Sequence, residues 1–291
     1  RDSRTQSARA LFWSCLALDV VWRSGGAAAA AVGAASESLL HLEGGFALKE
    51  VPLSDEEWAD AVRDQCRPRL LGGVAVAHTS NACAEVEEVL SSCSPRPPLL
   101  TLQAGAAFGF GDHPTTHLCG SWLLRDGSRV AGRSVLDYGC GTGVLALGAL
   151  LLGASSATGV DCDLASLMLA RSNAERNSLP LELYAGLDAE RGDWPCVSFY
   201  SPSSHARGET IFATGPPEGA RFDVVVANMT ADPLTRLAPR IAKSLAVGGR
   251  LALSGIRNHS VASVCEAYAA EGVSLSVHAG EGEWVLLAND H

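Results

Sequence analysis

The chain has 291 residues, of which 47% are hydrophobic and 19% charged, so it can bury a sizeable core and is not a disordered protein. Its 32 acidic residues exceed its 22 basic ones, and the formal net charge of -10 argues against nucleic acid as the primary ligand, because phosphate binding needs a positive surface. The acidic surplus promotes solubility and allows a basic partner.

The start of the sequence has two interpretations. Arginines at positions 1, 4 and 9 lead into an apolar run at 10–21. A basic, acid-poor lead is typical of an organelle transit peptide, and the alternative is a strand that opens a small N-terminal domain. We therefore expect a cytoplasmic protein, or one of the mitochondrial or plastid matrix if the start is a transit remnant. No stretch reaches the ~18 apolar residues of a membrane span, so we expect a soluble protein without a membrane partner.

The first part of the chain has an irregular pattern. Ser54 and Glu57 have the spacing of a capping box and predict a helix that stops before Pro68, and Val74 opens a short predicted strand. Residues 91–98, with the sequence SSCSPRPP, form the clearest linker. The predicted organisation is an N-terminal domain at 1–90, a linker at 91–98 and a second domain at 99–291.

From residue 134 short β-branched runs alternate with helical periodicity, which is typical of an α/β fold with a mostly parallel sheet covered by helices. Two closing strands this near in sequence favour an antiparallel hairpin. A Ser-, Pro- and Gly-rich stretch at 195–220 is expected to be an exposed insertion. The predicted strands are 134–138, 157–161, 181–184, 222–227, 250–254, 274–278 and 283–288, and helices are predicted at 144–152, after Asp163, after Asp232 and at 260–271.

Two of these helices carry detailed predictions. Asp163 is expected to cap the first of them, and Asp232 is expected to be the N-cap of the second, with Pro233 at its first position. Gly248 and Gly249 are expected to end the second helix. The predicted apolar face of the first comprises Leu164, Leu167, Met168 and the stem of Arg171, and that of the second comprises Leu234, Leu237, Ala238, Ile241 and Leu245.

The sharpest motif is the glycine-rich turn after the strand at 134–138. Glycines there let the backbone turn and approach a ligand without a Cβ clash. A dinucleotide-binding turn would place its third glycine at 144, whereas here Gly139, Gly141 and Gly143 follow Asp137. This spacing indicates a ligand that lacks a pyrophosphate. The alternative is a turn whose glycines are purely structural.

A second acid, Asp161, ends the strand predicted at 157–161. In open α/β sheets ligands lie at the carboxyl ends of strands, and an acid at this point accepts both hydroxyls of a ribose. Asp163 is a competing candidate, but its N-cap position gives it another role. Asp161 and the glycine turn together predict S-adenosylmethionine as cofactor, with its sulfonium and carboxylate over the turn near Asp137.

Asn228 ends the next predicted strand beside the same crevice and is the candidate catalytic residue. An asparagine there can accept a hydrogen bond from an amine and aim its lone pair at a methyl group. Deprotonating a lysine of pKa ~10.4 at pH 7 costs ~4.6 kcal/mol, and an α-amino group costs only about 1 kcal/mol. Positioning can contribute ~7 to 11 kcal/mol, so orientation without a strong base is sufficient. The alternative is that Asn228 merely ends a strand.

Two further stretches are candidates for a role in the site. Residues 108–116, with the sequence FGFGDHPTT, are too glycine-rich for a helix and too apolar for a solvent-exposed loop without a function. We therefore interpret them as a lid over the cofactor. His113, His117 and Cys119 include metal-ligating types but have no partner pair elsewhere, so no metal is expected. Nine scattered cysteines without a C-x-x-C pair indicate a reducing compartment.

Taken together, these stretches resemble one family, the PrmA methyltransferases that modify protein eleven of the large ribosomal subunit. The resemblance covers about residues 100–291, and a weaker similarity extends to residues 57–68. The glycine turn alone would fit any class I methyltransferase, so the specificity comes from the combination of motifs. The matching stretches are 108–116, 137–143, Asp161, 226–234, 251–256 and 282–284.

The resemblance implies a Rossmann-like, seven-stranded methyltransferase domain and a small N-terminal α+β domain that recognises the substrate. It implies cofactor contacts from Thr116, Gly139, Asp161 and Asn228, and transfer to lysine ε-amines and an N-terminal α-amine. We expect a monomer that acts on a basic ribosomal protein and does not bind nucleic acid directly. The sequence departs from the family pattern at Phe110, where the family has Thr, at Gln103-Ala104, at Met229-Thr230 and in the insertion at 195–220.

Other functions remain as alternatives. One is methylation of another protein, such as the lysines of an electron-transfer flavoprotein subunit, for which a different acidic motif would replace 228–233. A nucleic-acid methyltransferase is disfavoured because an Asn-Pro-Pro-aromatic motif is absent and the net charge is acidic. A non-catalytic module that binds S-adenosylmethionine is a third alternative, against which Asn228 argues.

Overall fold

The computed structural model describes residues 5–12, 16–23, 48–53, 67–103, 111–125, 127–186 and 215–289. The chain divides into two compact units, Arg1–Gln65 and Cys66–His291. Phe110, the helix predicted from Ser54 and most of the predicted insertion lie outside the described residues.

The first unit contains a three-stranded antiparallel sheet in the order β2-β1-β3. Its strands are β1 (Thr5–Phe12), β2 (Leu16–Arg23) and β3 (Leu48–Leu53). The described residues of the apolar run, 10–12 and 16–21, fall on β1 and β2, in agreement with the strand interpretation.

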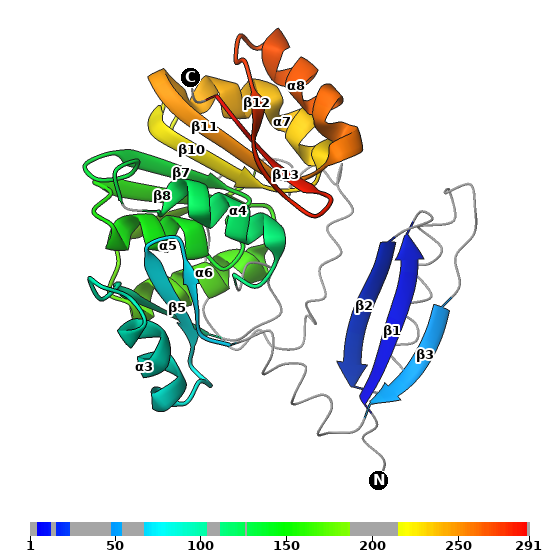
Figure 1. Ribbon diagram of the computed structural model, residues 1–291. Helices are drawn as coiled ribbons and strands as arrows, with labels where there is room; N and C mark the ends of the chain where they lie inside the picture. The colour runs from blue at the N-terminus through cyan, green and yellow to red at the C-terminus, as the bar shows by residue number, and fades with distance from the viewer. Residues whose placement is uncertain are drawn as a thin grey trace, which may run out of the picture. The chain divides into compact units, whose positions relative to one another are not determined.

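The second unit is built on a seven-stranded sheet in the order β12-β13-β11-β10-β7-β8-β9 (Figure 1). The five strands from β11 to β9 run parallel, and β12 and β13 form an antiparallel hairpin whose β13 pairs with β11. The predicted α/β fold class and the closing hairpin are therefore confirmed. The strands are β7 (Ser134–Tyr138), β8 (Ser156–Asp161), β9 (Leu181–Ala185), β10 (Phe222–Asn228), β11 (Leu245–Arg257), β12 (Ser276–Glu281) and β13 (Trp284–Ala288).

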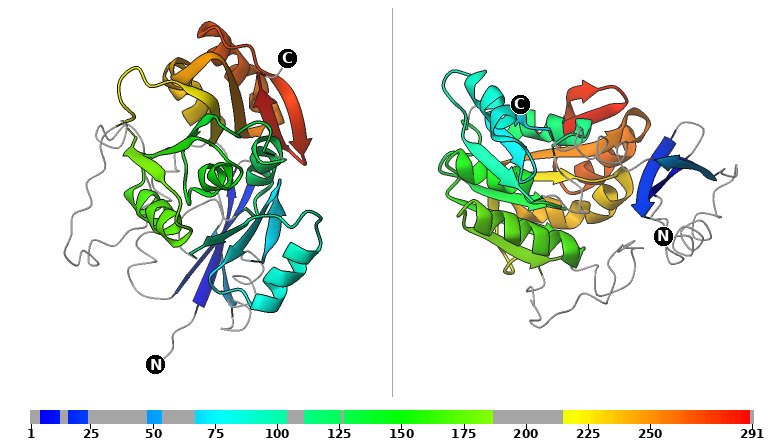
Figure 2. Two further views of the ribbon diagram at one scale, coloured as in Figure 1. Left: turned by 90° about the vertical axis from the view of Figure 1, so that its left-hand side faces the viewer. Right: turned by 90° about the horizontal axis from the view of Figure 1, so that it is seen from below.

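Helices cover both faces of this sheet (Figures 1 and 2). Strand residues alternate between the two faces: Val135 of β7 packs with α4 and α5, and Leu136 packs with α7 and α8. None of the described helices is long and apolar enough to cross a membrane. The first face carries α4 (Pro114–Leu123), α5 (Val144–Leu151) and α6 (Leu164–Arg176), and the second carries α7 (Ala231–Ser244) and α8 (Val261–Ala270), which follows the short 3-10 helix Asn258–Ser260.

A second, three-stranded sheet packs beside α5 and α6. It is formed by β4 (Arg69–Leu71), β5 (Val74–His78) and β6 (Leu99–Leu102), and α3 (Cys83–Ser91) connects the parallel strands β5 and β6. The segment 91–98 therefore lies inside the second unit, whereas the sequence predicted a domain boundary there. The reason is that the chain on both sides of this segment contributes strands to one sheet.

Two asparagine side chains, Asn173 of α6 and its C-cap Asn177, bind the backbone of β6 and of the residue that follows it. Asn177 accepts from the Thr101 amide at 2.9 Å and donates to its carbonyl at 2.8 Å. The fully buried Asn173 accepts from the Gln103 amide at 2.8 Å and donates to the carbonyl of Thr142, in the glycine turn, at 3.0 Å. The two side chains thus provide hydrogen-bond partners for backbone amides and carbonyls outside the helix. The helical pattern of the sequence does not predict these contacts.

The predicted apolar face of α6 is wrong. Leu164 and Met168 are 55% and 49% exposed, although Leu167 is fully buried. Ala170 lies close to Gly143 of the glycine turn, so this face of the helix accommodates small side chains rather than a broad aliphatic stripe. The predicted N-cap is confirmed, because the Asp163 carboxylate accepts from two backbone amides of the first turn.

The ends of α7 also differ from the prediction. Its N-cap is Thr230 rather than Asp232, which lies in the first turn, where a negative charge interacts favourably with the helix dipole. The helix ends at Ser244, before Gly248 and Gly249, because the chain enters β11 directly at Leu245. The rest of the predicted stripe is confirmed as buried, namely Leu234, Leu237, Ala238 and Ile241.

Candidate functional site

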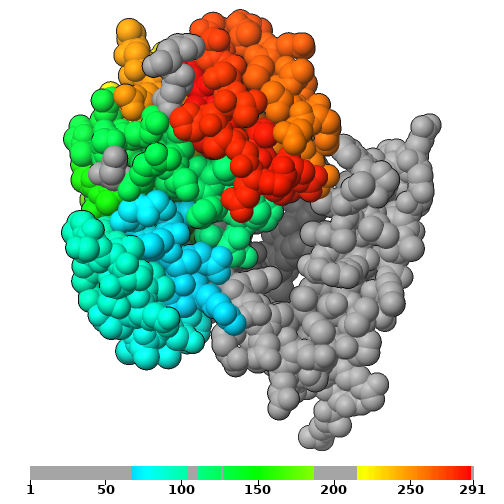
Figure 3. All heavy atoms as spheres, in the orientation of Figure 1, coloured from blue at the N-terminus to red at the C-terminus, as the bar shows by residue number. Residues whose placement is uncertain are grey.

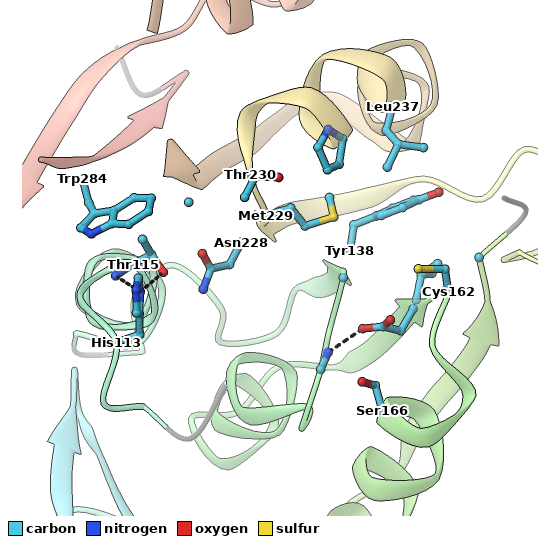
Figure 4. Close-up of a pocket in the computed structure, with 17 residues that line it drawn as sticks. His113, Thr115, Tyr138, Cys162, Ser166, Asn228, Met229, Thr230, Leu237 and Trp284 are labelled. Carbon is cyan, nitrogen blue, oxygen red and sulfur yellow. Dashed lines mark hydrogen bonds between the residues drawn. The ribbon is translucent and has the colours of Figure 1, made fainter. Parts of the chain in front are cut away.

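A cavity of about 460 Å³ opens at the carboxyl ends of the parallel strands (Figure 4). This is the edge at which open α/β sheets bind ligands, and the volume is in the usual range for small-molecule sites. Trp284, His113 and Thr115 gather at one end of the cavity, Cys162 and Ser166 lie at the other, and Asn228 lies between them. The lining residues are His113, Thr115, Tyr138, Gly139, Gly141, Val160, Asp161, Cys162, Ser166, Gly186, Asn228, Met229, Thr230, Pro233, Leu237, Gly255 and Trp284.

The glycine turn forms one wall of this cavity. Gly139, Gly141 and Gly143 have φ angles of 80°, 52° and 80°, in the left-handed region that favours glycine. Gly139 and Gly141 line the cavity, and a Cβ at Gly139 would lie 2.8 Å from the Met229 sulfur. Gly143 does not line it and is instead the N-cap of α5. The turn therefore needs glycine for two reasons, close approach to the cavity and the change of direction at the start of the helix.

Asp161 ends β8 at the cavity wall. Its two carboxylate oxygens accept from the amide of Gly141 at 2.8 Å and from the amide of Asp163 at 2.9 Å. Burial raises the pKa of Asp161, and these two backbone hydrogen bonds oppose that rise. Each carboxylate oxygen keeps a second lone pair, so the group can accept from ligand hydroxyls while it holds the glycine turn against the strand end.

Asp137 lies beneath the turn rather than in the cavity lining. Its side chain is 1% exposed and accepts from the Ala146 amide in the first turn of α5 at 3.3 Å. Burial raises the pKa of Asp137 to about 7, and the nearby carboxylate of Asp161 contributes to the rise. Asp137 is therefore placed to hold the N-terminus of α5, and its charge changes near neutral pH.

Asn228, at the middle of the cavity, contacts Thr116, which is 112 residues away in sequence. The Asn228 side-chain nitrogen donates to the Thr116 hydroxyl oxygen at 3.2 Å. Thr116 is 1% exposed, in the first turn of α4, and lies behind Asn228 rather than in the cavity lining. Because the amide nitrogen is held by Thr116, the amide oxygen of Asn228 is the atom left to accept from a ligand in the cavity.

His113 and Thr115 are lining residues that sequence reasoning did not assign to the site. His113 is the N-cap of α4, and its Nδ1 accepts from the Thr115 amide at 3.3 Å and lies 2.8 Å from the Thr115 hydroxyl. An Nδ1 that accepts leaves the ring proton on Nε2. Burial lowers the pKa of His113, while Asp112 and Glu281 raise it. Both residues lie within the motif at 108–116, which the sequence analysis interpreted as a lid without giving either residue a role in the site.

Trp284 is a further lining residue to which the sequence analysis gave no role. Its ring lies 5.2 Å from that of His113 in an edge-on arrangement, and the Arg257 guanidinium lies 5.1 Å from its centroid. The hairpin that carries Trp284 packs against α4 (Figure 3). The matching stretch at 282–284 contained this residue, but no chemical pattern in the sequence placed it near Asn228.

The three residues considered as metal ligands have separate partners. His113 caps α4, the exposed His117 lies 3.3 Å from Glu281, and Cys119 is buried with its pKa raised by burial. Within the described ranges, no group of three His, Cys, Asp or Glu side chains could hold a metal ion. Of the lid predicted at 108–116, residues 108–110 lie outside the described part, 111–113 lead directly into α4, and 114–116 form its first turn.

Comparisons with known proteins agree on one family. The family model "Ribosomal protein L11 methyltransferase (PrmA)" matches residues 6–291. Proteins named ribosomal protein L11 methyltransferase from Edwardsiella ictaluri and Escherichia coli are 37% and 36% identical over 254 and 245 residues, which are 86% and 84% of this chain and 73% and 71% of those proteins. One from Klebsiella pneumoniae is 37% identical over 230 residues, 78% of this chain and 66% of that protein.

A solved structure shares the fold. The ribosomal protein L11 methylase from Lactobacillus delbrueckii subsp. bulgaricus has a TM-score of 0.55 and 23% sequence identity, with 76% of this chain and 96% of that chain covered. The chain spans 66 to 73% of the length of the three curated relatives described above.

Proposed function

Because the chain belongs to the PrmA family of ribosomal protein L11 methyltransferases, we propose that it transfers methyl groups from S-adenosylmethionine to amino groups of ribosomal protein L11. The observation that supports the proposal is that Asn228, held from behind by Thr116, and Asp161 line the same cavity. Lysine ε-amines are the proposed acceptors, together with the N-terminal α-amine.

The cavity fits the cofactor in its donor set and its shape. The Asp161 carboxylate is placed to accept the two ribose hydroxyls, and the backbone of Gly139 and Gly141 permits close approach. Tyr138, Met229 and Leu237 supply an apolar wall against which an adenine ring can pack. The predicted site residues Thr116, Asp137 and Gly143 do not line the cavity, so we propose indirect, supporting roles for them.

Asn228 orients the acceptor amine. The bound cofactor supplies a methyl group on a positively charged sulfonium, which is open to attack by an amine lone pair. With its nitrogen held by Thr116, the Asn228 amide can accept a hydrogen bond from the amine through its oxygen and so direct the nitrogen lone pair. The contribution of such positioning, ~7 to 11 kcal/mol, exceeds the ~4.6 kcal/mol needed to deprotonate a lysine at pH 7.

His113 is poorly suited to act as the base. Its Nδ1 already accepts from the Thr115 amide, so in the neutral ring the proton is on Nε2 and no ring nitrogen is left to accept the proton of the amine. We therefore propose that the amine loses its proton to solvent before it reaches Asn228. His113 keeps the first turn of α4 in place, where Thr116 holds the Asn228 amide.

The charge of the protein supports a basic substrate. The formal net charge is -10, and the carboxylates of Asp112 and Glu281 are near enough to raise the pKa of His113 at the cavity wall. Negative charge there favours the approach of a lysine side chain. We propose that the N-terminal part of the chain recognises the substrate and that the enzyme acts as a monomer.

The proposal predicts which protein is labelled. Incubation with methyl-labelled S-adenosylmethionine and purified large-subunit proteins is expected to label L11, detected by mass spectrometry of its peptides. An L11 variant with Arg at each lysine separates labelling of the side chains from labelling of the α-amine. Failure to label L11 despite measurable cofactor binding would contradict the substrate, and labelling of an electron-transfer flavoprotein subunit instead would favour the alternative.

Replacing Asp161 tests the proposed cofactor contact. In an Asp161→Asn variant the amide nitrogen faces one of two backbone donors, from Gly141 or Asp163, and one charge-assisted acceptor for the ribose is lost. We expect the Kd for S-adenosylmethionine, measured by calorimetry, to rise about ten- to a hundredfold. Asp223→Asn, a change of the same type on β10, is the control. An unchanged Kd in the Asp161 variant would refute the contact.

A further inference from the structure

The end of the cavity formed by Trp284 is left open by the proposed position of the cofactor. Cys162 and Ser166 lie at the opposite end, next to Asp161, where the proposed ribose contact places the adenosine part of the cofactor (Figure 4). Asn228, which is proposed to orient the amine, lies between the two ends. The Trp284 end is therefore the part of the cavity available to the side chain that carries the acceptor amine.

Side chains from two other elements contact the ring of Trp284, the first residue of β13. The ring of His113, the N-cap of α4, lies 5.2 Å from it at an interplanar angle of 67°, which is a favourable edge-to-face arrangement. The guanidinium group of Arg257, the last residue of β11, lies over the ring at 5.1 Å from its centroid. This distance is within the range of a cation–π interaction. The position of the ring therefore depends on α4 and on β11.

The register of the sheet brings Arg257 to Trp284. The two residues are directly opposite each other in the antiparallel pairing of β11 with β13. Side chains at directly opposite positions lie on the same face of a sheet and within contact distance. The Arg257 side chain is only 15% exposed, and a cation–π interaction is stronger when it is shielded from water. Arginine also stacks on aromatic rings through its planar group, which limits the movement of both side chains.

Arg257 has a second contact, an ion pair with Glu283. The Arg257 Nε lies 3.4 Å from a Glu283 carboxylate oxygen, and the Glu283 side chain is 51% exposed. Ion pairs that are exposed to solvent to this extent contribute little free energy. We therefore attribute the position of the Trp284 ring to its contact with the guanidinium group and not to the ion pair.

We propose that Arg257 is a positioning residue that holds Trp284 against the acceptor lysine. The inference rests on the proposed methyl transfer to lysine side chains. The apolar stem of a lysine packs on apolar surface while its amine stays in a polar environment. A Trp284 ring held by Arg257 offers such a surface at the end of the cavity beyond Asn228. Arg257 does not line the cavity, so it acts on the acceptor through Trp284.

The first test compares Arg257→Ala with wild type in the full chain. We expect kcat/KM for methylation of L11 lysines to fall about three- to tenfold, as for the loss of one cation–π contact. The Kd for S-adenosylmethionine, measured by calorimetry, should change less than about twofold, which also shows that the variant is folded. Arg129→Ala is the matched control, because Arg129 lies 4.6 Å from the ring centroid of Trp122 and neither residue lines the cavity. The control should keep the wild-type kcat/KM.

Two conservative variants separate the charge of Arg257 from its volume. Arg257→Lys keeps a cation over the Trp284 ring, whereas Arg257→Gln keeps a planar polar group without the charge. We expect the lysine variant to stay within about threefold of the wild-type kcat/KM and the glutamine variant to fall as far as Arg257→Ala. Equal rates in the lysine and glutamine variants would overturn the cation–π role.

A double-mutant cycle with Trp284→Leu tests whether Arg257 acts through the ring. Without the ring, Arg257→Ala should cause no further loss of kcat/KM, because the two residues are expected to act as a unit. The same loss in both backgrounds would overturn the proposal, since Arg257 would then affect the enzyme independently of Trp284. Wild-type protein that methylates no L11 would refute the proposed function and this inference with it. Methylation by the wild type with an unchanged rate in Arg257→Ala would refute this inference alone.

Discussion

Replacing Asp137 by asparagine is expected to make the protein more stable relative to wild type as the pH rises. Burial raises the pKa of Asp137 to about 7 in the folded state, from an ordinary value of 3.8. Between these values the folded protein binds more protons than the unfolded chain, so wild-type stability falls with rising pH. The amide introduced by Asp137→Asn does not ionise, and its oxygen can still accept from the Ala146 backbone amide.

The expected size follows from the pKa shift. The difference in unfolding free energy between Asp137→Asn and wild type should grow by about 3 kcal/mol between pH 5 and pH 8, measured by urea denaturation at each pH. Asp223 is the control, because hydrogen bonds from Ser134 lower its pKa and its contribution is lost as pH falls. Asp223→Asn should therefore leave the difference from wild type nearly constant between pH 5 and pH 8 and change it, in the opposite sense, only below about pH 5. Parallel wild-type and Asp137→Asn profiles would show that the Asp137 carboxyl is not perturbed.

Replacing Asn228 by alanine is expected to lower kcat for methyl transfer about 10²- to 10³-fold. The loss of one preorganised polar group in an active site has effects of this size. The Asn228 amide is held by Thr116 and faces the cavity, so its oxygen is placed to orient the acceptor amine. The Kd for S-adenosylmethionine should change less than kcat, and measuring both separates orientation of the amine from cofactor binding.

Thr116 provides the matched pair of variants for this mechanism. Thr116→Val removes the hydroxyl that accepts from Asn228 with little change in volume, whereas Thr116→Ser keeps it. We expect kcat to fall about tenfold in the valine variant, as for the loss of one hydrogen bond, and to recover in the serine variant. Equal rates in the two variants, or wild-type kcat in Asn228→Ala, would rule out the proposed orientation of the amide.

The catalytic region was predictable because its signals are local. The turn from Asp137 to Gly143 combines a strand, left-handed glycines and a helix within one short stretch, and Asp161 follows at the end of the next strand. Parallel strands bring their carboxyl ends to one edge of a sheet, so the order of elements alone places Asp161 and Asn228 beside the same cavity.

Predictions that required knowledge of packing were less successful. Leu164 and Met168 have helical spacing that indicates a buried face, yet both are exposed, because α6 turns a different face, with Leu167 and Ala170, toward the sheet and the glycine turn. The boundary predicted at 91–98 rested on local composition, whereas β5 and β6 pair across that segment. Periodicity and composition describe a local segment, and they do not show which other segments pack against it.

The sequence by itself determined the α/β class, the glycine turn, the identity of Asp161 and Asn228 as candidates, and the resemblance to one family. Only the tertiary structure decided how these residues work together. It placed Thr116 behind Asn228, Asp137 beneath the turn and Trp284 at the cavity wall. The physical reason is that most of these contacts join segments far apart in the chain, and only folding brings them within hydrogen-bonding or packing distance.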